Sequence, residues 1–376
     1  MTSKEHKKHT ALVKPDGGQF HRNELALIGA PCGYIQELAG VIERDLRGNF
    51  RLGYADADHG SGDSQELPFE VMYTDKINYH SAAFRDEHLE FSMSAYFQST
   101  DAVLINGNHF SGASQIVLVH PDKKESLSRK LDRLTNVILF VLAEGVEEPW
   151  SFLKDSVQNF NDIPVVRRDE VGLICRSVKE YILFRRPVVK GLVLAGGQSL
   201  RMGTDKGAIE YFGKPQRDHV AEMLSNVCDS VWISTRDEHS VESSYPLLKD
   251  SFVGLGPYGG ILSAFREDPN AAWLCVACDV PLLDLASIQL LVNERDESKV
   301  ATCFHNPETN FPEPLITLWE PRAYPRLLHF LAKGYSCPRK ALINSDSNEI
   351  KVPNPDVLTN VNTPEELERI KNRQHV

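Results

Sequence analysis

The sequence has no apolar run long enough to cross a lipid bilayer. Its longest, from Val137 to Ala143, falls far short of the roughly 20 residues that a membrane-spanning helix needs. The segment from Met1 to Thr10 is polar and rich in Lys and His, unlike a signal peptide. A basic excess is missing too, since 41 Lys and Arg stand against 52 Asp and Glu and give a formal charge of −11. Because nucleic-acid binding needs basic surface, we expect a cytoplasmic protein that contacts neither membrane nor nucleic acid.

The cysteines do not have the pattern of a disulfide framework. The seven are scattered and odd in number, which favours a reducing compartment. Cys275 and Cys278 are spaced like half of a zinc site, but no second pair follows at zinc spacing. They lie in an apolar run in which residues three apart point to opposite faces of a strand. We therefore predict that both belong to the hydrophobic core.

The overall amino-acid composition, with 41% hydrophobic and 25% charged residues, is typical of a soluble globular protein. A length of 376 residues predicts two ordinary domains. Residues 184–187, Phe-Arg-Arg-Pro, have the character of a linker because proline disfavours continuation of a helix. We place the domains at 1–186 and 187–376. Each is expected to be an α/β unit with a mostly parallel sheet flanked by helices.

The first half alternates apolar strand candidates with helical patterns. Residues 25–28 predict a strand, residues 29–33 a turn, and the spacing from Tyr34 to Ile42 a helix. The other expected elements are strands at 101–106, 115–119, 138–142 and 163–166, a helical face made by Leu131, Leu134, Val137 and Ile138, and a terminal helix at 171–182. This alternation favours a parallel sheet with crossover helices.

The turn after the first strand has the outline of a phosphate-binding P-loop without its chemistry. A working P-loop has four residues between its glycines, and the second glycine is followed by Lys and a hydroxyl residue. Here three residues separate Gly29 from Gly33, and Tyr34 and Ile35 stand where the Lys and the Ser or Thr would be. A plain turn between a strand and a helix explains these residues equally well.

Several histidines and aspartates fall near expected loops of this half. They are His59, His80, His109, Asp56 and Asp58. A single loop histidine is more often a surface residue than a ligand, and a loop carboxylate is usually solvated. We therefore predict that these five side chains are surface groups.

The second half opens with the most informative stretch of the chain, residues 188–207. Leu192 to Leu194 predict a buried strand, and Gly196 and Gly197 break it. Glycines let the backbone turn sharply and bring its N–H groups close to phosphate oxygens. Arg201 and Lys206 follow at a distance from which both cations reach the same anion.

A second strand delivers a carboxylate. The run from Trp273 to Cys278 is apolar, and Asp279 follows at its carboxyl end, before Pro281. Ligands bind at that edge of open α/β sheets, and Mg²⁺ prefers carboxylate, water and phosphate oxygens. We therefore predict that Asp279 is a ligand of Mg²⁺; the alternative role is that of a helix N-cap.

These motifs resemble those of the nucleotidyltransferases that include molybdenum cofactor guanylyltransferase, the MobA-like family. The similar stretches are Leu-Ala-Gly-Gly at 194–197, Arg-Met-Gly-Thr-Asp-Lys-Gly at 201–207, the glycine-rich turn at 254–260, the strand at 313–319, Cys-Asp-Val-Pro at 278–281 and Asn-Val-Asn-Thr-Pro-Glu-Glu-Leu at 360–367. The resemblance covers residues 191–370. It departs from the family at Ser234, where relatives carry Asn. Arg339 and Lys340 are either contacts to an anionic substrate or surface charges.

The resemblance implies a Rossmann-like domain that transfers GMP from GTP to molybdopterin or Mo-molybdopterin and releases pyrophosphate. Arg201, Lys206 and Asp279 are the implied catalytic residues, with Mg²⁺ on Asp279. The implied nucleotide contacts are Leu194, Ala195, Gly196, Gly197, Lys206, Ser234, Asp250 and Asp279, and the implied acceptor contacts are Asn360 and Asn362. Molybdoenzymes and other cofactor-biosynthesis proteins are the implied protein partners.

The first half resembles, in the order of its strands, the small P-loop GTPase MobB, which is an accessory partner of the guanylyltransferase and is sometimes fused to it. In that family Glu usually precedes the glycine after the strand at 101–106, whereas this chain has Asn106. Because the catalytic residues are missing, the resemblance implies a degenerate P-loop fold and no GTPase activity.

Two other functions remain consistent with the residues. One is a related nucleotidyltransferase with another base or acceptor, such as a cytidylyltransferase. Relatives of that kind tend to carry Leu-Ala-Ala-Gly, whereas residues 194–197 are Leu-Ala-Gly-Gly. The other is a carrier that binds the cofactor or a molybdoenzyme without turnover. Arg201, Lys206 and Asp279 favour the enzyme.

Overall fold

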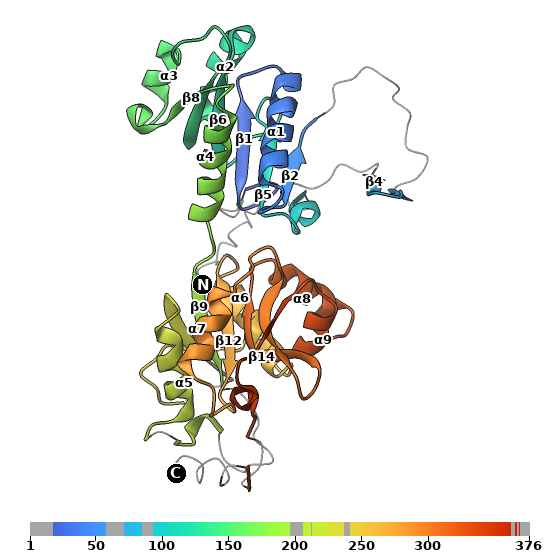
Figure 1. Cartoon of the computed structure of the whole chain (residues 1–376), viewed down its shortest axis with the longest axis vertical. Helices are drawn as coiled ribbons and strands as arrows, with labels where there is room; N and C mark the ends of the chain where they lie inside the picture. Colours follow the sequence, from blue (N-terminus) through green and yellow to red (C-terminus); the bar gives the residue numbers. More distant parts are fainter. Residues whose placement is uncertain are drawn as a thin grey trace, which may run out of the picture. The chain divides into compact units, whose positions relative to one another are not determined.

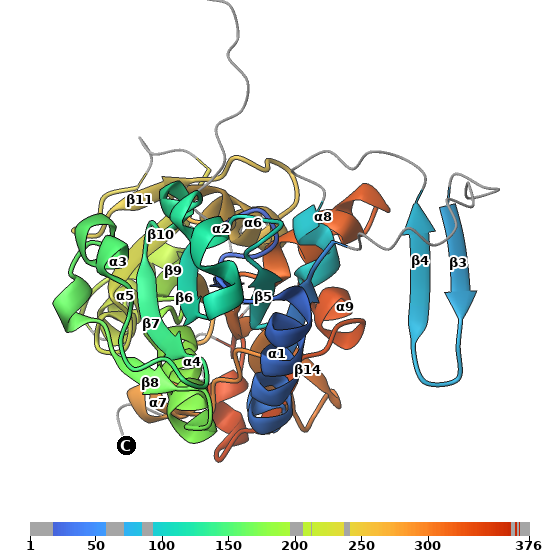
Figure 2. The ribbon, with the colours of Figure 1, turned by 90° about the horizontal axis from the view of Figure 1, so that it is seen from above.

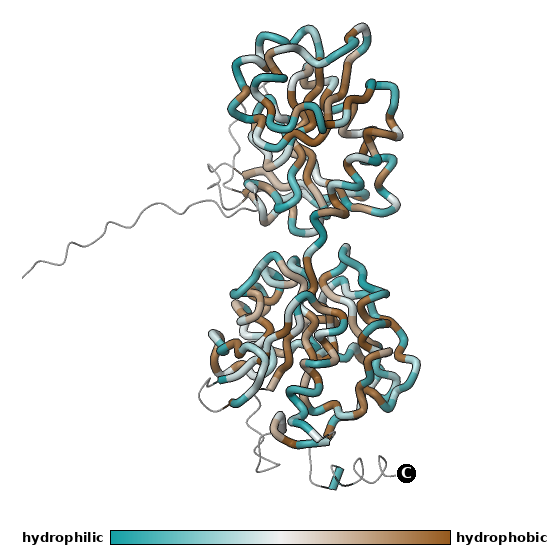
Figure 3. Tube along the Cα trace, turned by 90° about the vertical axis from the view of Figure 1, so that its left-hand side faces the viewer, coloured by the Kyte–Doolittle hydropathy of each residue, from teal (hydrophilic) through white to brown (hydrophobic). Residues whose placement is uncertain are grey.

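The chain divides into two compact units, Met1–Arg185 and Arg186–Val376 (Figure 1). The structure, a computed structural model, describes residues 18–57, 71–84, 93–195, 206–211, 213–236, 241–361, 365, 366 and 368. Within these residues no helix is both long and apolar enough to span a membrane. Each unit is built on its own sheet, and hydrophobic segments run through the interior of each (Figure 3).

The first unit has a parallel sheet in the order β2-β5-β1-β6-β7-β8. Its strands are β1 (Glu24–Ile28), β2 (Leu52–Ala55), β5 (Ala102–Asn106), β6 (Ser114–Val119), β7 (Val137–Leu142) and β8 (Val165–Arg167). Its helices are α1 (Cys32–Leu46), α2 (Lys124–Ser128), α3 (Ser151–Ser156) and α4 (Val171–Phe184). Two further strands, β3 (Val71–Asp75) and β4 (His80–Phe84), pair antiparallel with each other, as two adjacent arrows in Figure 2 show.

Both faces of this sheet are covered, which explains the continuous apolar runs of its strands. In β6, Ile116 and Leu118 pack with residues of α1 and α4. Val117 and Val119 point the other way and pack with Leu127 of α2 and Leu153 of α3. The expected helical face from Leu131 to Ile138 is wrong. A short 3₁₀ turn at Leu131–Arg133 precedes β7, and the β-branched residues Val137 and Ile138 already belong to the strand.

The turn that connects β1 to α1 requires a glycine. Gly29 has φ of 101°, and a Cβ there would lie 2.5 Å from the backbone oxygen of Leu118 in β6. Glycine avoids both the backbone strain and the collision. The chain can therefore turn at once into α1, whose first residue is Cys32. The predicted strand, turn and helix are confirmed at this point.

The second unit has a mixed sheet in the order β11-β10-β9-β12-β14-β13-β15. Its strands are β9 (Val189–Leu194), β10 (Ser230–Thr235), β11 (Leu247–Lys249), β12 (Ala272–Ala277), β13 (Ala301–Asn306), β14 (Phe311–Trp319) and β15 (Asn348–Lys351). β14 runs antiparallel to both β12 and β13, whereas the other pairings are parallel. The expectation of a mostly parallel sheet thus holds with one reversed strand.

Helices cover this second sheet from both sides. α5 (Gln216–Ser225) and α7 (Leu285–Asn293) share a core with one face, and α6 (Pro257–Glu267), α8 (Ala323–Ala332) and α9 (Pro338–Ile343) share a core with the other. Cys275 and Cys278 are both buried, and they belong to different cores. Their predicted role as core residues is confirmed, although only Cys275 lies in β12, and Cys278 follows its last residue.

Candidate functional site

The predicted site residues of the second unit gather at one edge of its sheet. β9, β10, β11 and β12 are parallel, so their carboxyl ends meet at the same edge. Leu194, which ends β9, pairs in register with Ser234 on one side and with Ala277 on the other. Asp250 follows β11 directly, and Asp279 follows β12. Four residues that are far apart in the sequence therefore lie along one edge.

A buried serine and a half-buried aspartate form a hydrogen-bonded pair at this edge. Ser234 is 2% exposed, and its Oγ donates to Oδ1 of Asp250 at 2.7 Å. The Asp250 backbone N–H donates to the Thr235 oxygen at 2.9 Å, which fixes the main chain beneath the carboxylate. Burial raises the pKa of Asp250, while the Ser234 hydrogen bond and the Arg236 charge oppose that rise. The pair thus holds a carboxylate in a fixed orientation.

Glycines bring the start of α6 against this pair. A Cβ on Gly260 would lie 2.8 Å from Ser234 Oγ and 2.9 Å from Leu194 Cδ2. A Cβ on Gly259 would lie 2.2 Å from the Phe252 oxygen. Only residues without a side chain allow this approach, so the glycine-rich turn predicted near the nucleotide does pack against the sheet edge.

The structure pairs Asp279 with a second carboxylate that the sequence did not reveal. In the antiparallel pairing of β12 with β14, Trp273 faces Trp319 and Val276 faces Ile316. This pairing brings the start of β14, where Glu313 lies, to the carboxyl end of β12, and the charge of Asp279 acts on the Glu313 carboxyl. Glu313 is 3% exposed; burial raises its pKa, and the nearby charge of Asp279 adds to the rise.

Two further contacts surround this acidic pair. Arg339 places Nη2 3.6 Å from Oε2 of Glu313, so it contacts the site through that carboxylate. The N–H of Val361 donates to the Asp279 backbone oxygen at 2.8 Å, which brings the preceding Asn360 beside the site. Tyr211 also lies near: burial raises its pKa to about 12, with the charges of Cys278 and Asp279 adding to the shift.

Some predicted residues cannot be placed. Gly196, Gly197, Arg201 and Asn362 lie outside the described residues. Lys206 begins the 3₁₀ turn Lys206–Ala208, and only its backbone is described. The predicted roles of these residues therefore stay predictions. Glu313 was missed because its partner strand is set by the tertiary fold, although a Glu directly before a Pro and an apolar strand was visible in the sequence.

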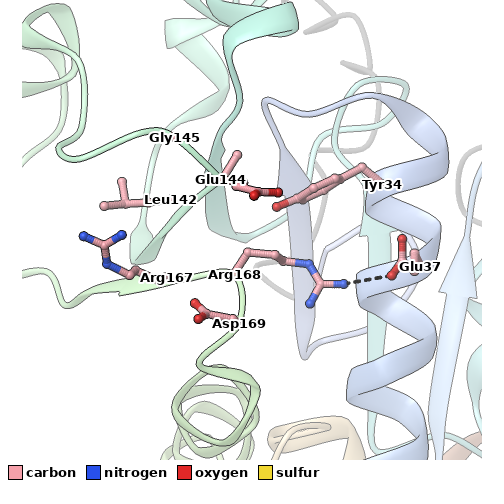
Figure 4. Close-up of a pocket in the computed structure, with 9 residues that line it drawn as sticks. Tyr34, Glu37, Leu142, Glu144, Gly145, Arg167, Arg168 and Asp169 are labelled. Atoms are coloured by element: carbon pink, nitrogen blue, oxygen red, sulfur yellow. Dashed lines mark hydrogen bonds and ion pairs between the residues drawn. The ribbon is translucent and has the colours of Figure 1, made fainter.

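The first unit contains a separate cavity of about 580 Å³ (Figure 4). The first turns of α1 and the segments that follow β7 and β8 line it, with Tyr34, Glu37, Leu142–Gly145 and Arg167–Asp169. The Arg168 guanidinium lies 5.4 Å from the centre of the Tyr34 ring and 3.5 Å from Oε1 of Glu37. The lining combines two arginines with three acidic side chains. Because both signs are present, its charge does not select a class of ligand.

The geometry is that of an α/β unit with a polar site at the carboxyl edge of its parallel strands, as in nucleotide-binding sheets. Residues 191–348 match the MobA-like NTP transferase domain. A molybdenum cofactor guanylyltransferase of Photobacterium profundum is 34% identical over 185 residues, which are 47% of this chain and 93% of that protein. The chain therefore belongs to the MobA-like molybdenum cofactor guanylyltransferase family.

Two other similar proteins extend the comparison. A molybdenum cofactor biosynthesis bifunctional protein of Synechocystis is 34% identical over 183 residues, which are 48% of this chain. The match spans 53% of that protein, about half of its length. The crystal structure of a molybdopterin-guanine dinucleotide biosynthesis protein A from Archaeoglobus fulgidus is similar at 23% identity with a TM-score of 0.43, and it covers 50% of this chain and 98% of its own.

Proposed function

We propose that the second unit transfers GMP from GTP to the terminal phosphate of molybdopterin or Mo-molybdopterin and releases pyrophosphate. The observation that carries the proposal is the convergence, at one sheet edge, of the Ser234–Asp250 pair with Asp279 and the nearby Glu313. One pair offers an oriented acceptor for a base, and the other offers oxygen ligands for a cation beside phosphates. Membership of the guanylyltransferase family supports the choice of reaction.

The chain's own residues would act by positioning and by charge. The Asp250 carboxylate can accept paired N–H donors from guanine N1 and from its exocyclic amine, and Ser234 holds it in orientation. Arg201 and Lys206 would neutralise the triphosphate. Asn360, beside Asp279, would contact the acceptor, as would Asn362. No protein nucleophile is needed, because the attacking phosphate is already an anion.

Mg²⁺ fits the donor set of this edge. Asp279 and Glu313 offer carboxylate oxygens, which this cation prefers, and no softer ligand is required. Asp279 would hold the ion, and Glu313 would add negative charge next to it. When bound, Mg²⁺ supplies positive charge for the α- and β-phosphates of GTP.

Pyrophosphate release by the full chain tests the proposal. The protein would be supplied with Mg²⁺ and either GTP or CTP, each with and without the molybdenum cofactor. We expect release that requires GTP and the cofactor together. Release with CTP instead would assign the site to cytidylyl transfer. If the protein bound nucleotide but released no pyrophosphate under any condition, the result would favour the carrier function over the enzyme.

The Ser234–Asp250 pair predicts a pH dependence of GTP binding. Asp250 must be ionised to accept two N–H groups, and its pKa is raised, so GTP affinity should fall as the pH decreases through that raised value. Ser234→Ala removes a hydrogen bond that opposes the rise. The GTP affinity of the variant should therefore begin to fall at a higher pH than that of the wild type. In this pH range the variant should bind GTP roughly tenfold more weakly, the usual effect of losing a hydrogen bond to a charged group.

Isothermal titration with GTP between about pH 8 and about pH 5 measures this difference across the range in which a raised carboxyl pKa lies. Ser230→Ala is the matched control, because Ser230 begins the same strand at its opposite end and should leave the curve unchanged. If the curves of GTP affinity against pH coincided for Ser234→Ala and the wild type, the Ser234–Asp250 pair would have no role in base recognition.

Glu313 predicts a pH dependence of the metal requirement. Its pKa is raised, so protonation competes with cation binding at a higher pH than for an ordinary glutamate. Glu313→Gln should weaken the apparent Mg²⁺ affinity on the order of tenfold and flatten its dependence on pH. Mg²⁺ titrations of pyrophosphate release at several pH values measure both effects. Glu308→Gln, an exposed change on the neighbouring turn, is the control. If the Mg²⁺ titration of Glu313→Gln matched that of the wild type, the Glu313 carboxylate would not belong to the metal site.

For the first unit we propose a degenerate MobB-like P-loop domain that docks a partner or shapes the acceptor site. The sheet is parallel, and a glycine turn connects β1 to α1, which supports the comparison of fold. Tyr34 and Ile35 lack the ammonium and hydroxyl groups that a P-loop uses on phosphate and magnesium. We expect no phosphate release from GTP by the full chain when the cofactor is absent. Hydrolysis at an ordinary GTPase rate would contradict this part of the proposal.

A further inference from the structure

Three adjacent strands of the first unit each bring a reactive side chain to the same sheet edge. The strands are β2, β5 and β1, in that spatial order. Asp56 follows β2, His109 lies three residues after β5, and Cys32 is the first residue of α1 after β1. Asp56 is exposed, as predicted, whereas the predicted surface role of His109 is wrong, because its side chain is only 13% exposed.

The three side chains meet at one nitrogen of the imidazole ring. Cys32 Sγ lies 3.3 Å from His109 Nε2, and Asp56 Oδ1 lies 3.7 Å from the same atom. Tyr54 Oη donates to the other oxygen of Asp56 at 2.7 Å. Burial alone would raise the pKa of Asp56, but hydrogen bonds from Tyr54 and from the Ala57 N–H, with the His109 charge, bring it below its usual value. The carboxylate is thus held as an anion beside Nε2.

Basic side chains lie on the loop that carries Asn108, next to the thiol. Cys32 begins a helix that runs to Leu46 and has no acidic residue in its first turn. Lys130 Nζ donates to the Asn108 oxygen, and Arg133 Nη1 donates to the Gly107 oxygen, each at 2.9 Å. Burial and the charges of Arg133 and Lys123 lower the pKa of Lys130, whereas the charge of Cys32 opposes this. Three cations therefore lie near one another on this side of the sheet.

The other cysteines of the chain differ in their surroundings. Cys175, Cys275, Cys278 and Cys303 are buried, and Cys337 is exposed. Burial raises the pKa of the half-buried Cys228 to about 12, which suppresses its thiolate. Cys32 combines partial exposure with an imidazole within hydrogen-bonding reach, the arrangement typical of an activated nucleophile.

We propose that Cys32 is a nucleophilic thiol, with His109 as its base, that exchanges with negatively charged low-molecular-mass disulfides. His109 Nε2 takes the Cys32 proton, and the thiolate attacks one sulfur of the disulfide. The Cys32–sulfur bond forms as the reactant's S–S bond breaks, and the electron pair leaves with the departing thiolate. His109 returns the proton to that thiolate, so one thiol and one disulfide give a mixed disulfide and a new thiol.

The neighbours of the dyad have defined roles in this step. Asp56 stabilises the imidazolium, because its carboxylate faces the nitrogen that receives the proton. Asn108 Nδ2 lies 3.8 Å from Cys32 Sγ and donates to the Ala30 oxygen at 2.8 Å, which holds the two loops together. Lys123, Lys130 and Arg133 raise the local concentration of an anionic reactant.

The first experiment uses the full chain carrying Cys337→Ser, which removes the exposed thiol. Its reaction with 5,5′-dithiobis(2-nitrobenzoate), an anionic aromatic disulfide, is followed by the absorbance of the released thiolate. We expect one fast equivalent and a mixed disulfide on the peptide that contains Cys32, identified by mass spectrometry. Adding Cys32→Ser should remove that phase. A fast phase that survives the Cys32→Ser change, or no fast phase in the parent, overturns the proposal.

Variants of His109 and Asp56 show whether Cys32 reacts because a base activates it or only because its thiol is exposed. In the Cys337→Ser background, His109→Asn should slow the fast phase by about 10²-fold and shift its pH profile, because the base that takes the Cys32 proton is gone. Asp56→Asn should slow it less and shift the profile in the same direction. Far-ultraviolet circular dichroism verifies that each variant is folded. A pH profile unchanged by His109→Asn would leave Cys32 as an accessible thiol without a base and would refute the dyad.

The preference for an anionic reactant has its own readout. 4,4′-Dithiodipyridine is neutral and reacts by the same exchange. We expect Lys130→Gln to slow the anionic reagent several-fold and to leave the neutral one nearly unchanged, and added salt to reproduce that selective effect. Equal slowing of both reagents by Lys130→Gln would refute the electrostatic selection.

Discussion

Replacing Asp279 with alanine should reduce GTP-dependent pyrophosphate release by at least about 10²-fold, the typical cost of removing one group that stabilises charge in a transition state. The carboxylate follows the carboxyl end of β12, near Glu313, and it is the group proposed to hold Mg²⁺. Its removal leaves the phosphates without an oriented cation, whereas base recognition through Asp250 is retained. GTP binding should therefore weaken far less than turnover.

A matched control lies at the other end of the same strand. Asp268 precedes β12, pairs with Lys190 at 2.6 Å and sits at the opposite sheet edge. Asp268→Ala should leave kcat and the Mg²⁺ dependence nearly unchanged. It therefore shows whether a loss of activity depends on where the carboxylate lies or follows from losing any carboxylate. Steady-state rates over a range of Mg²⁺ concentrations measure both variants. An Asp279→Ala protein that keeps its turnover would contradict the enzyme mechanism. Equal losses in the two variants would point to a structural effect.

Local patterns were sufficient to predict most strands of both units. A buried parallel strand is apolar on both faces, so β5, β6, β9 and β12 stand out as short continuous runs. The same physics explains the failure between Leu131 and Ile138. Four apolar residues at helical spacing fitted a helix, but the last two continue into the run that forms β7, and burial in the sheet decides their conformation.

The candidate site could be anticipated from a local pattern where a residue closely follows an apolar strand, as Asp279 does, whereas Ser234 came from the family resemblance. It was not predictable where the partner comes from a strand distant in sequence. Glu313 meets Asp279 only because β14 runs antiparallel to β12, a choice made by the whole sheet. Cys32 and His109 lie 77 positions apart and meet for the same reason, because β1 and β5 are neighbours in space. Such pairs carry no local signal.

Replacing Arg295 with alanine should lower the free energy of unfolding of the second unit by about 3–5 kcal/mol, the usual cost of breaking a buried ion pair. Its guanidinium donates to both oxygens of Glu320, at 2.7 and 2.9 Å, and to the Pro187 oxygen at 3.0 Å. Glu320 is 1% exposed and Arg295 12%. The variant leaves a carboxylate in the core without its counter-charge, and it also releases the segment that leads into β9.

Urea unfolding followed by tryptophan fluorescence measures this loss, because three of the chain's four tryptophans, Trp232, Trp273 and Trp319, belong to the second unit. Lys299→Ala is the control: its pair with Asp346, at 28% and 52% exposure, should contribute less than about 1 kcal/mol. Combining Arg295→Met with Glu320→Leu should recover much of the stability, since no charge is then buried alone. A loss below about 1 kcal/mol for Arg295→Ala would mean that water reaches Glu320 once the arginine is gone, and burial would then not account for the pair.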